Sequence, residues 1–147
     1  MYETTRKSLI RFVTDQIAAI NTALGTSLTY TDFDAHGDLA KAPAADVVGL
    51  HAFEMADQDQ FQVTTFGIMV SAYDDPNLLT QNKYMNWFYN RMRIRNLIPL
   101  LDPVSGAVIG NIIMMLGTVT FPVERADTRA ASYIMGHGKV VVAEPAG

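Results

Sequence analysis

The stretch "FQVTTFGIMVSAYDDP", residues 61–76, decides the fold because a strand runs directly into the start of a helix. β-branched and aromatic side chains dominate residues 61–73, which is typical of a strand. Its length exceeds that of a usual strand, so we expect a bend near Gly67. Gln62 and Thr64 lie at the start of one face of this strand, and we expect them to be nearer solvent. The apolar residues on that face are Phe66, Ile68, Val70 and Ala72.

The residues that follow predict a long helix. Asp74 or Asp75 can accept hydrogen bonds from exposed backbone N–H groups, and Pro76 suits the first helical position. We expect the helix to run from residue 76 to about residue 97, because Pro99 disfavours helical geometry at Ile98. Its apolar stripe comprises Leu78, Met85, Phe88 and Met92, widened by Tyr84, Trp87 and Ile94.

A second amphipathic helix is predicted at residues 5–24. Its apolar residues recur every three or four positions, and Gly25 suits a left-handed cap at its end. The remaining segments predict strands. They are residues 27–33, 47–54, 107–116 and 118–123, and residues 131–135 and 139–143 on either side of a "GHG" turn.

This order of elements predicts an α+β fold. We expect a mostly antiparallel sheet, with the N-terminal amphipathic helix and one long central helix packed on it. The 147 residues are about one domain long, so residues 1–147 are taken as a single domain. Within it we expect an acidic loop at about residues 30–46 and a flexible tail at about residues 144–147.

The composition excludes several classes of protein. The chain has no cysteine, so disulfides, thiolate metal sites and a cysteine nucleophile are excluded. No apolar run approaches the length of a membrane span, so no membrane association is expected. The net charge is −4, and residues 30–60 alone carry seven acids against one lysine. A strongly basic surface, as nucleic-acid binding requires, is missing.

Three short motifs contain residue types that can carry chemistry. "DAHGD" places Asp34, His36 and Asp38 at alternating positions, a possible metal site, but the spacing is generic and favours a solvated loop. "GHGK", residues 136–139, lacks the Ser/Thr and the helix of a phosphate loop, so a tight turn is favoured. Ser105 lacks the strand and helix of a nucleophile elbow. We therefore predict no catalytic residue, no cofactor and no metal, and a protein that is not an enzyme.

The arginines of "NRMRIR" are the clearest candidates for binding. On a helix Arg91 and Arg95 would share a face, while Arg93 would point elsewhere. Two such cations are too few for strong nucleic-acid binding. Arginine beside tryptophan, tyrosine and methionine is typical of a subunit interface, so Arg91, Arg93 and Arg95 are predicted to lie in one.

The order of elements, and above all the stretch "FQVTTFGIMVSAYDDPNLLTQNKYMNWFYNRM", resembles the tail terminator and neck proteins of tailed bacteriophages. The resemblance implies a structural virion protein that forms a homo-oligomeric ring, commonly a hexamer. Such a ring ends the tail tube and joins it to the head connector, and DNA passes through the lumen without sequence-specific binding. The implied partners are the connector, the tail tube and the sheath, and the implied location is the virion neck, after synthesis in the host cytoplasm.

Acidic residues are compatible with a channel that repels DNA. The candidates for the lumen or an interface are Asp32, Asp34, Asp38, Asp57 and Asp59. Two alternatives stay open. One is another neck, tail-tube or baseplate subunit, including a head-completion or tail-completion protein. The other is a small α+β enzyme that uses His36, His51 or His137 as its acid–base group.

Overall fold

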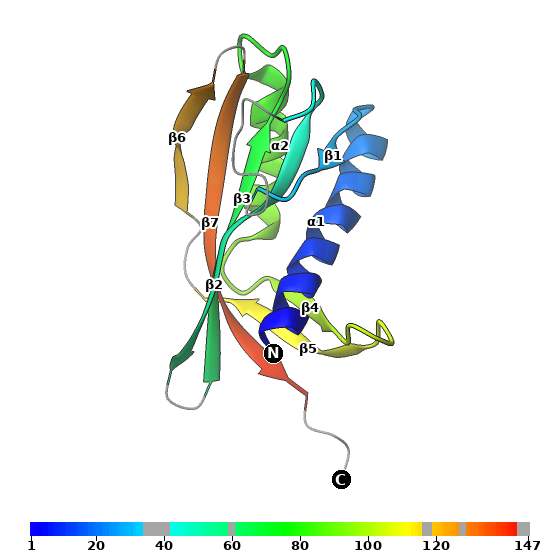
Figure 1. Ribbon diagram of the computed structural model, residues 1–147, viewed down its shortest axis with the longest axis vertical. Coiled ribbons are helices and arrows are strands. Elements are labelled where there is room, and N and C mark those ends of the chain that lie inside the picture. The colour runs from blue at the N-terminus through cyan, green and yellow to red at the C-terminus, as the bar shows by residue number, and fades with distance from the viewer. Residues whose placement is uncertain (34–41, 59–60, 116–118, 127–128, 144–147) are drawn as a thin grey trace.

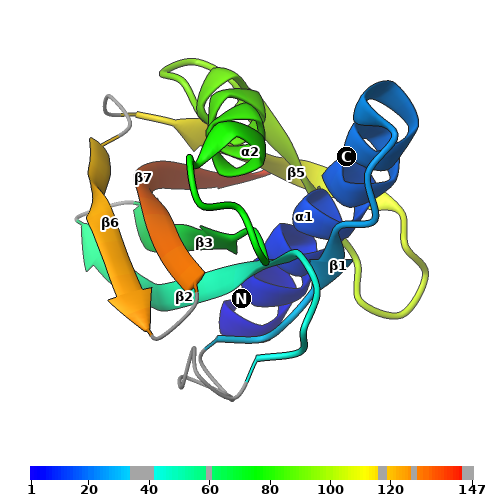
Figure 2. The ribbon, with the colours of Figure 1, turned by 90° about the horizontal axis from the view of Figure 1, so that it is seen from above.

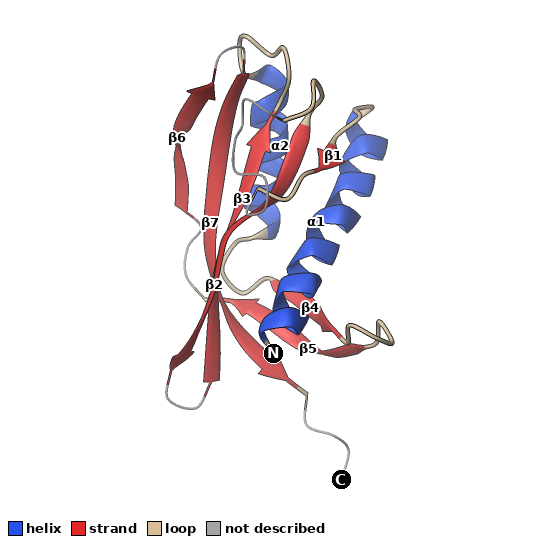
Figure 3. Cartoon of the chain, viewed as in Figure 1, coloured by secondary structure: helices blue, strands red, loops and turns tan. Residues whose placement is uncertain are grey.

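A computed structural model of the chain describes residues 1–33, 42–58, 61–115, 119–126 and 129–143. These residues form two helices and a curled sheet, which confirms the α+β class (Figures 1 and 3). The helices are α1 (Tyr2–Leu24) and α2 (Leu79–Arg91). The strands are β1 (Thr29–Tyr30), β2 (Val47–Gln58), β3 (Phe61–Ser71), β4 (Leu97–Leu101), β5 (Val108–Met114), β6 (Val119–Ala126) and β7 (Arg129–Val142).

The sheet is mixed, with the order β1-β2-β3-β7-β5-β4, and β6 also pairs with β7. The short β1–β2 pair is parallel, and the other described pairs are antiparallel. The prediction of a mostly antiparallel sheet is therefore confirmed in part. β1 is much shorter than the strand predicted at residues 27–33.

β7 joins the two halves of the sheet. One of its edges pairs with β3 from Ser132 to Val140. Its other edge pairs first with β6, as far as Met135, and then with β5, from Gly138 onward. In Figure 1 the two partners diverge from β7, with β6 toward the top and β5 toward the bottom. This edge of β7 therefore changes its neighbouring strand from β6 to β5 around Gly136.

The predicted "GHG" turn is wrong, because residues 136–138 lie inside the continuous strand β7. The two glycines in this segment leave space for core side chains. A Cβ on Gly136 would lie 2.7 Å from the Cε atom of Met114, and a Cβ on Gly138 would collide with the Cγ2 atom of Ile112. Tertiary packing, which a local pattern does not contain, explains these two glycines.

Both helices pack on the same face of the sheet, and Figure 2 shows them side by side from above. α1 buries Leu9, Val13 and Ile20 completely and ends at Gly25 in the predicted left-handed conformation, with φ 66°. The β3 residues predicted to share one face are all in this core. Thr64, expected nearer solvent, is also fully buried.

The irregularity predicted at Gly67 lies in the neighbouring strand. The register of β2 shifts between His51 and Glu54, and Ala52 has a positive φ of 53°. His51 pairs with Gly67, where a Cβ would lie 3.0 Å from the carbonyl oxygen of His51. The extra residue changes which side chains of β2 face the core, from Leu50 before the bulge to Phe53 after it.

α2 is shorter at both ends than the predicted helix of residues 76–97. It begins at Leu79, where the carboxylate of Asp75 accepts hydrogen bonds from the N–H groups of Thr80 (3.3 Å) and Gln81 (2.9 Å). It ends at Arg91, and the chain then forms β4, which contains Pro99. Pro99 therefore lies in a strand at the border of the sheet and does not terminate the helix.

Candidate functional site

Arg91 stacks on Trp87, the residue through which α2 contacts α1. Its guanidinium lies 3.8 Å from the centre of the Trp87 ring, and its Nη1 donates to the Trp87 carbonyl oxygen at 3.2 Å. The indole Nε1 of Trp87 in turn donates to the Oε1 atom of Gln16 on α1 at 2.9 Å. Arg91 is thus partly buried in a contact within one molecule.

The other two predicted arginines lie beyond the helix. Arg93 and Arg95 are both exposed, and Arg95 has a positive φ of 75°. The backbone N–H of Arg95 donates to the carbonyl oxygen of Met114 on β5 at 2.8 Å. The prediction that Arg91 and Arg95 share a helix face is wrong, because the helix ends at Arg91 and the next residues join the sheet.

Two apolar side chains accompany these arginines. Ile94 is 53% exposed and Leu97 is 57% exposed. The stripe predicted for α2 does include Tyr84, Phe88 and Met92, all fully buried, but Ile94 does not belong to it. We call residues 93–97 the basic turn: it presents two cations and two large apolar side chains to solvent.

The two predicted acidic residues that the structure describes, Asp32 and Asp57, lie on different segments of the fold. Asp32 makes an ion pair with Arg6 of α1 at 2.7 Å, so its charge is matched within the fold. Asp57 is exposed on the β2–β3 hairpin, where its Oδ1 accepts a hydrogen bond from the Nε2 atom of Gln62 at 3.2 Å. Asp34, Asp38 and Asp59 lie outside the described residues.

Glu54 adds a second exposed acid to that hairpin. We call the end of the hairpin, residues 54–58 with 61 and 62, the acidic arm. In Figure 1 it projects at the lower left, away from both helices. Its two described acids are exposed, and because they lie three residues apart on a regularly paired strand they face opposite sides of the hairpin.

The residues with candidate chemistry are described only in part. His36, with the whole "DAHGD" motif, lies outside the described residues, and in the described ranges no three His, Asp or Glu residues are grouped as metal ligands would be. His137 faces Thr65, with 3.0 Å between Nδ1 and Oγ1. The ring of His51 stacks beside that of Tyr133, with 5.2 Å between their centres.

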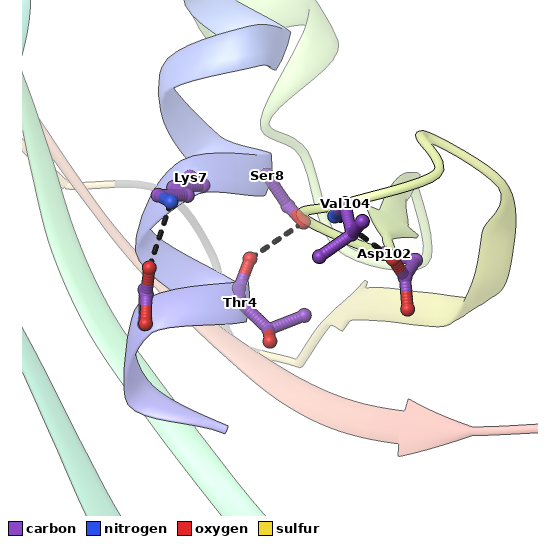
Figure 4. A network of polar contacts seen from close by, with 6 residues as sticks. Thr4, Lys7, Ser8, Asp102 and Val104 are labelled. Carbon is purple, nitrogen blue, oxygen red and sulfur yellow. Dashed lines mark hydrogen bonds and ion pairs between the residues drawn. The ribbon is translucent and has the colours of Figure 1, made fainter.

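Ser105 helps to build the tight turn between β4 and β5. Its Oγ accepts a hydrogen bond from the N–H of Ala107, and the carboxylate of Asp102 accepts from the N–H groups of Val104 and Ser105. These backbone donors lower the pKa of Asp102. Figure 4 shows this turn beside the N-terminus of α1. There the Oγ of Ser8 donates to the Thr4 carbonyl oxygen and accepts from the N–H of Leu101.

Sequence reasoning missed a buried polar network around Arg129, which is 7% exposed. Its guanidinium donates to the carbonyl oxygens of Pro43 (2.7 Å) and Ala45 (2.6 Å) and to the Oγ of Ser71 (3.0 Å). Burial lowers the pKa of Arg129. Arg129 thereby fastens residues 43–45 to the sheet. Within the segment "ERADTRA", which resembles a polar connection, no local signal distinguishes this arginine.

Asp46 and Gln81 extend the network to α2. Asp46 accepts hydrogen bonds from the Tyr84 hydroxyl (2.5 Å) and the N–H of Tyr73 (2.8 Å). Burial and this hydrogen bond raise the pKa of Tyr84. Gln81 accepts from the N–H of Ala72 and donates to the Oγ of Ser132. These polar groups satisfy one another inside the fold, which is the arrangement of a structural network.

No helix in the described part of the chain is long and apolar enough to cross a membrane.

Comparisons with known proteins identify the fold alone. No family model matches the sequence, and a search of curated proteins gives no match. One solved structure, which bears no functional name, aligns with a TM-score of 0.65 and 10% sequence identity over 99% of each chain. At that identity the likeness extends to the arrangement of helices and strands and carries no function.

Proposed function

We propose that this protein is a structural subunit of the neck of a tailed bacteriophage, of the tail-terminator kind. It forms a homo-oligomeric ring, a hexamer by resemblance, that ends the tail tube and joins it to the head connector. The observation that carries the proposal is the order of elements. An N-terminal helix, a strand pair, a helix shortly after "AYDDP" and a C-terminal β region follow one another as the resemblance implies.

The use of polar groups supports a structural role. Arg129, Gln81 and Asp46 are engaged in hydrogen bonds that join separate elements, and Arg91 is stacked on Trp87. An enzyme holds some of its polar groups ready for a substrate. Here Arg129, Gln81 and Asp46 hold separate elements of the fold together.

The exposed charges support passage of DNA without binding. Glu54 and Asp57 carry negative charge on a projecting hairpin, and the whole chain has a net charge of −4. Negative side chains around a lumen would repel the phosphate backbone, so the duplex would slide through. In this proposal the protein acts without a cofactor and is part of the virion.

Native mass spectrometry of the purified protein tests the ring, and labelled antibodies on purified virions test its place. We expect a closed oligomer and label at the junction of head and tail. Label at the tail tip or along the tube would favour a baseplate or tail-tube subunit instead. A protein that stays monomeric at high concentration and is missing from virions would exclude the proposal.

A further inference from the structure

The edges of the sheet differ in how they are protected from further strand pairing. On β4, Pro99 has no backbone N–H, and the N–H of Leu101 donates to the Oγ of Ser8 on α1. On β6, Pro122 lies within an irregularity of the register. Proline, an irregular register and cover by a helix are common means of blocking a sheet edge. Both of these strands are therefore poor templates for a further strand.

The end of β2 has no such protection. The short strand β1 pairs with the first two residues of β2, Val47 and Val48. Among the strands that the structure describes, residues 54–58 pair with β3 alone, and the backbone bonds outside the strands include none from them. These residues contain no proline and no lysine, and all but Met55 are exposed. Figure 1 shows this end of the hairpin projecting beyond both helices.

The backbone groups of Met55 and Asp57 point away from β3. The Oγ1 of Thr64 on β3 donates to the carbonyl oxygen of Glu54 at 3.0 Å, so that carbonyl faces β3. Successive residues of an antiparallel strand turn their N–H and C=O groups alternately to one side and to the other. Met55 and Asp57 therefore direct theirs to the open side, where unpaired donors and acceptors form a template for another strand.

We propose that β2 of a second copy adds to this edge, antiparallel and related by a two-fold axis at Ala56. Met55 of each copy then lies opposite Asp57 of the other, and these residues exchange the N–H···O=C bonds that are open in a single molecule. Glu54 of each copy lies opposite Gln58 of the other, whose amide can donate to the carboxylate. The strand thus complements itself in hydrogen bonding and brings no two carboxylates directly opposite each other.

The neighbouring registers are less favourable. An axis at Asp57 would set this carboxylate directly opposite its own copy, which is destabilising. An axis at Met55 would run the second strand into the irregular register that ends at Glu54. With the axis at Ala56, all of residues 54–58 are paired, and the two Asp57 side chains are diagonal neighbours about 7–8 Å apart.

This contact does not rest on the proposed function. A two-fold contact uses the same surface on both molecules and is complete once two copies have met. It is therefore distinct from the head-to-tail contact that a ring requires. The two proposals can be tested, and can fail, separately.

Cysteine cross-linking tests the register, because the chain has no cysteine of its own. Ala56→Cys would place two thiols across the axis, with Cα atoms about 4.5 Å apart, which a disulfide can bridge. Gln58→Cys is the matched control on the same strand, because its two thiols would lie about 14 Å apart along the strands. Glu54→Cys alone should behave like that control. An equal mixture of Glu54→Cys and Gln58→Cys should cross-link, because these positions lie opposite each other.

Mild oxidation followed by non-reducing electrophoresis measures the cross-linked dimer. We expect at least about tenfold more dimer from Ala56→Cys than from Gln58→Cys. Sedimentation gives a second measurement without a covalent bond. Asp57→Pro removes an outward N–H but no bond to β3, so it should weaken dimer formation at least about tenfold. Asp57→Asn keeps that N–H and removes the repulsion between the two carboxylates, so it should tighten the dimer.

The outcomes separate the two proposals. Equal cross-linking of Ala56→Cys and Gln58→Cys, or a folded Asp57→Pro variant that dimerises like the original chain, would overturn the contact. Label at the head–tail junction of virions would in that case still support the proposed function. A cross-link specific to position 56 in a protein that is missing from virions would support the contact and count against the neck role. Circular dichroism confirms folding, and cross-linking alone decides if Asp57→Pro does not fold.

Discussion

The hydroxyl of Tyr84 donates a hydrogen bond to the carboxylate of Asp46, and this contact joins α2 to the start of β2 across 38 positions of sequence. Tyr84 is fully buried, whereas Asp46 is half-buried. The same carboxylate also accepts the N–H of Tyr73 at the end of β3. The carboxylate of Asp46 therefore connects α2, the start of β2 and the end of β3, which are separate in sequence.

Tyr84→Phe should lower the free energy of unfolding by about 1–3 kcal/mol, because it leaves an oxygen of Asp46 without its donor. Urea denaturation followed by circular dichroism measures the change. Tyr89→Phe, on the exposed side of the same helix, is the control and should stay within about 0.5 kcal/mol. Equal effects of the two substitutions would show that the bond to Asp46 contributes nothing.

Arg129→Lys should destabilise the fold by about 2–3 kcal/mol, although it keeps the positive charge. A lysine lacks the planar guanidinium, whose N–H groups point in several fixed directions. The carbonyl oxygens of Pro43 and Ala45 would therefore lose donors that Arg129 supplies. Thermal unfolding measures the loss. Arg93→Lys provides the control at an exposed arginine, and it should leave the unfolding temperature unchanged.

The glycines of β7 should respond unequally to a methyl group. Gly138→Ala places a Cβ against the stiff, branched side chain of Ile112, so we expect a loss of about 1–3 kcal/mol. Gly136→Ala meets the flexible ends of Met114 and Met92, which can move, so its cost should be smaller. Chemical denaturation of both variants gives the comparison. A larger loss at Gly136 would contradict the packing described for β7.

Asp102→Asn should destabilise the protein at neutral pH and lose that effect in acid. The pKa of Asp102 is lowered in the folded chain, so its carboxylate stabilises the fold above the unfolded pKa of about 3.9. That contribution disappears as the pH falls through the lowered pKa. Denaturation of the original chain and the variant between about pH 2 and pH 7 measures the difference. A difference that does not change with pH would point to the turn geometry and not to the charge.

Local patterns predicted the elements whose structure is set locally. The alternation in residues 61–73 gave β3 and its buried face, and the helical stripe with Gly25 gave α1 and its end. The end of α2 was missed for a nonlocal reason. Residues 97–101 pair with β5, and that pairing outweighs the helical pattern that continues through Ile94.

The candidate surface was predicted only in part, for the same reason. The sequence indicated that Arg93 and Arg95 could meet a partner, and the structure leaves both exposed. It also grouped Arg91 with them, because the contact with Trp87 and Gln16 depends on how two helices meet. Arg129 and Gly138 owe their roles to segments far away in sequence, so no window of neighbouring residues reveals them.

The position of β7 has a consequence for how the molecule folds. β3, β5 and β6 are each synthesised before β7, yet each depends on it for a neighbour in the sheet. Until residues 129–142 emerge, the β2–β3 hairpin and the β4–β5 hairpin have no strand between them. Because most pairings that β7 makes span long stretches of chain, we expect slow folding that is completed only after these residues have been made.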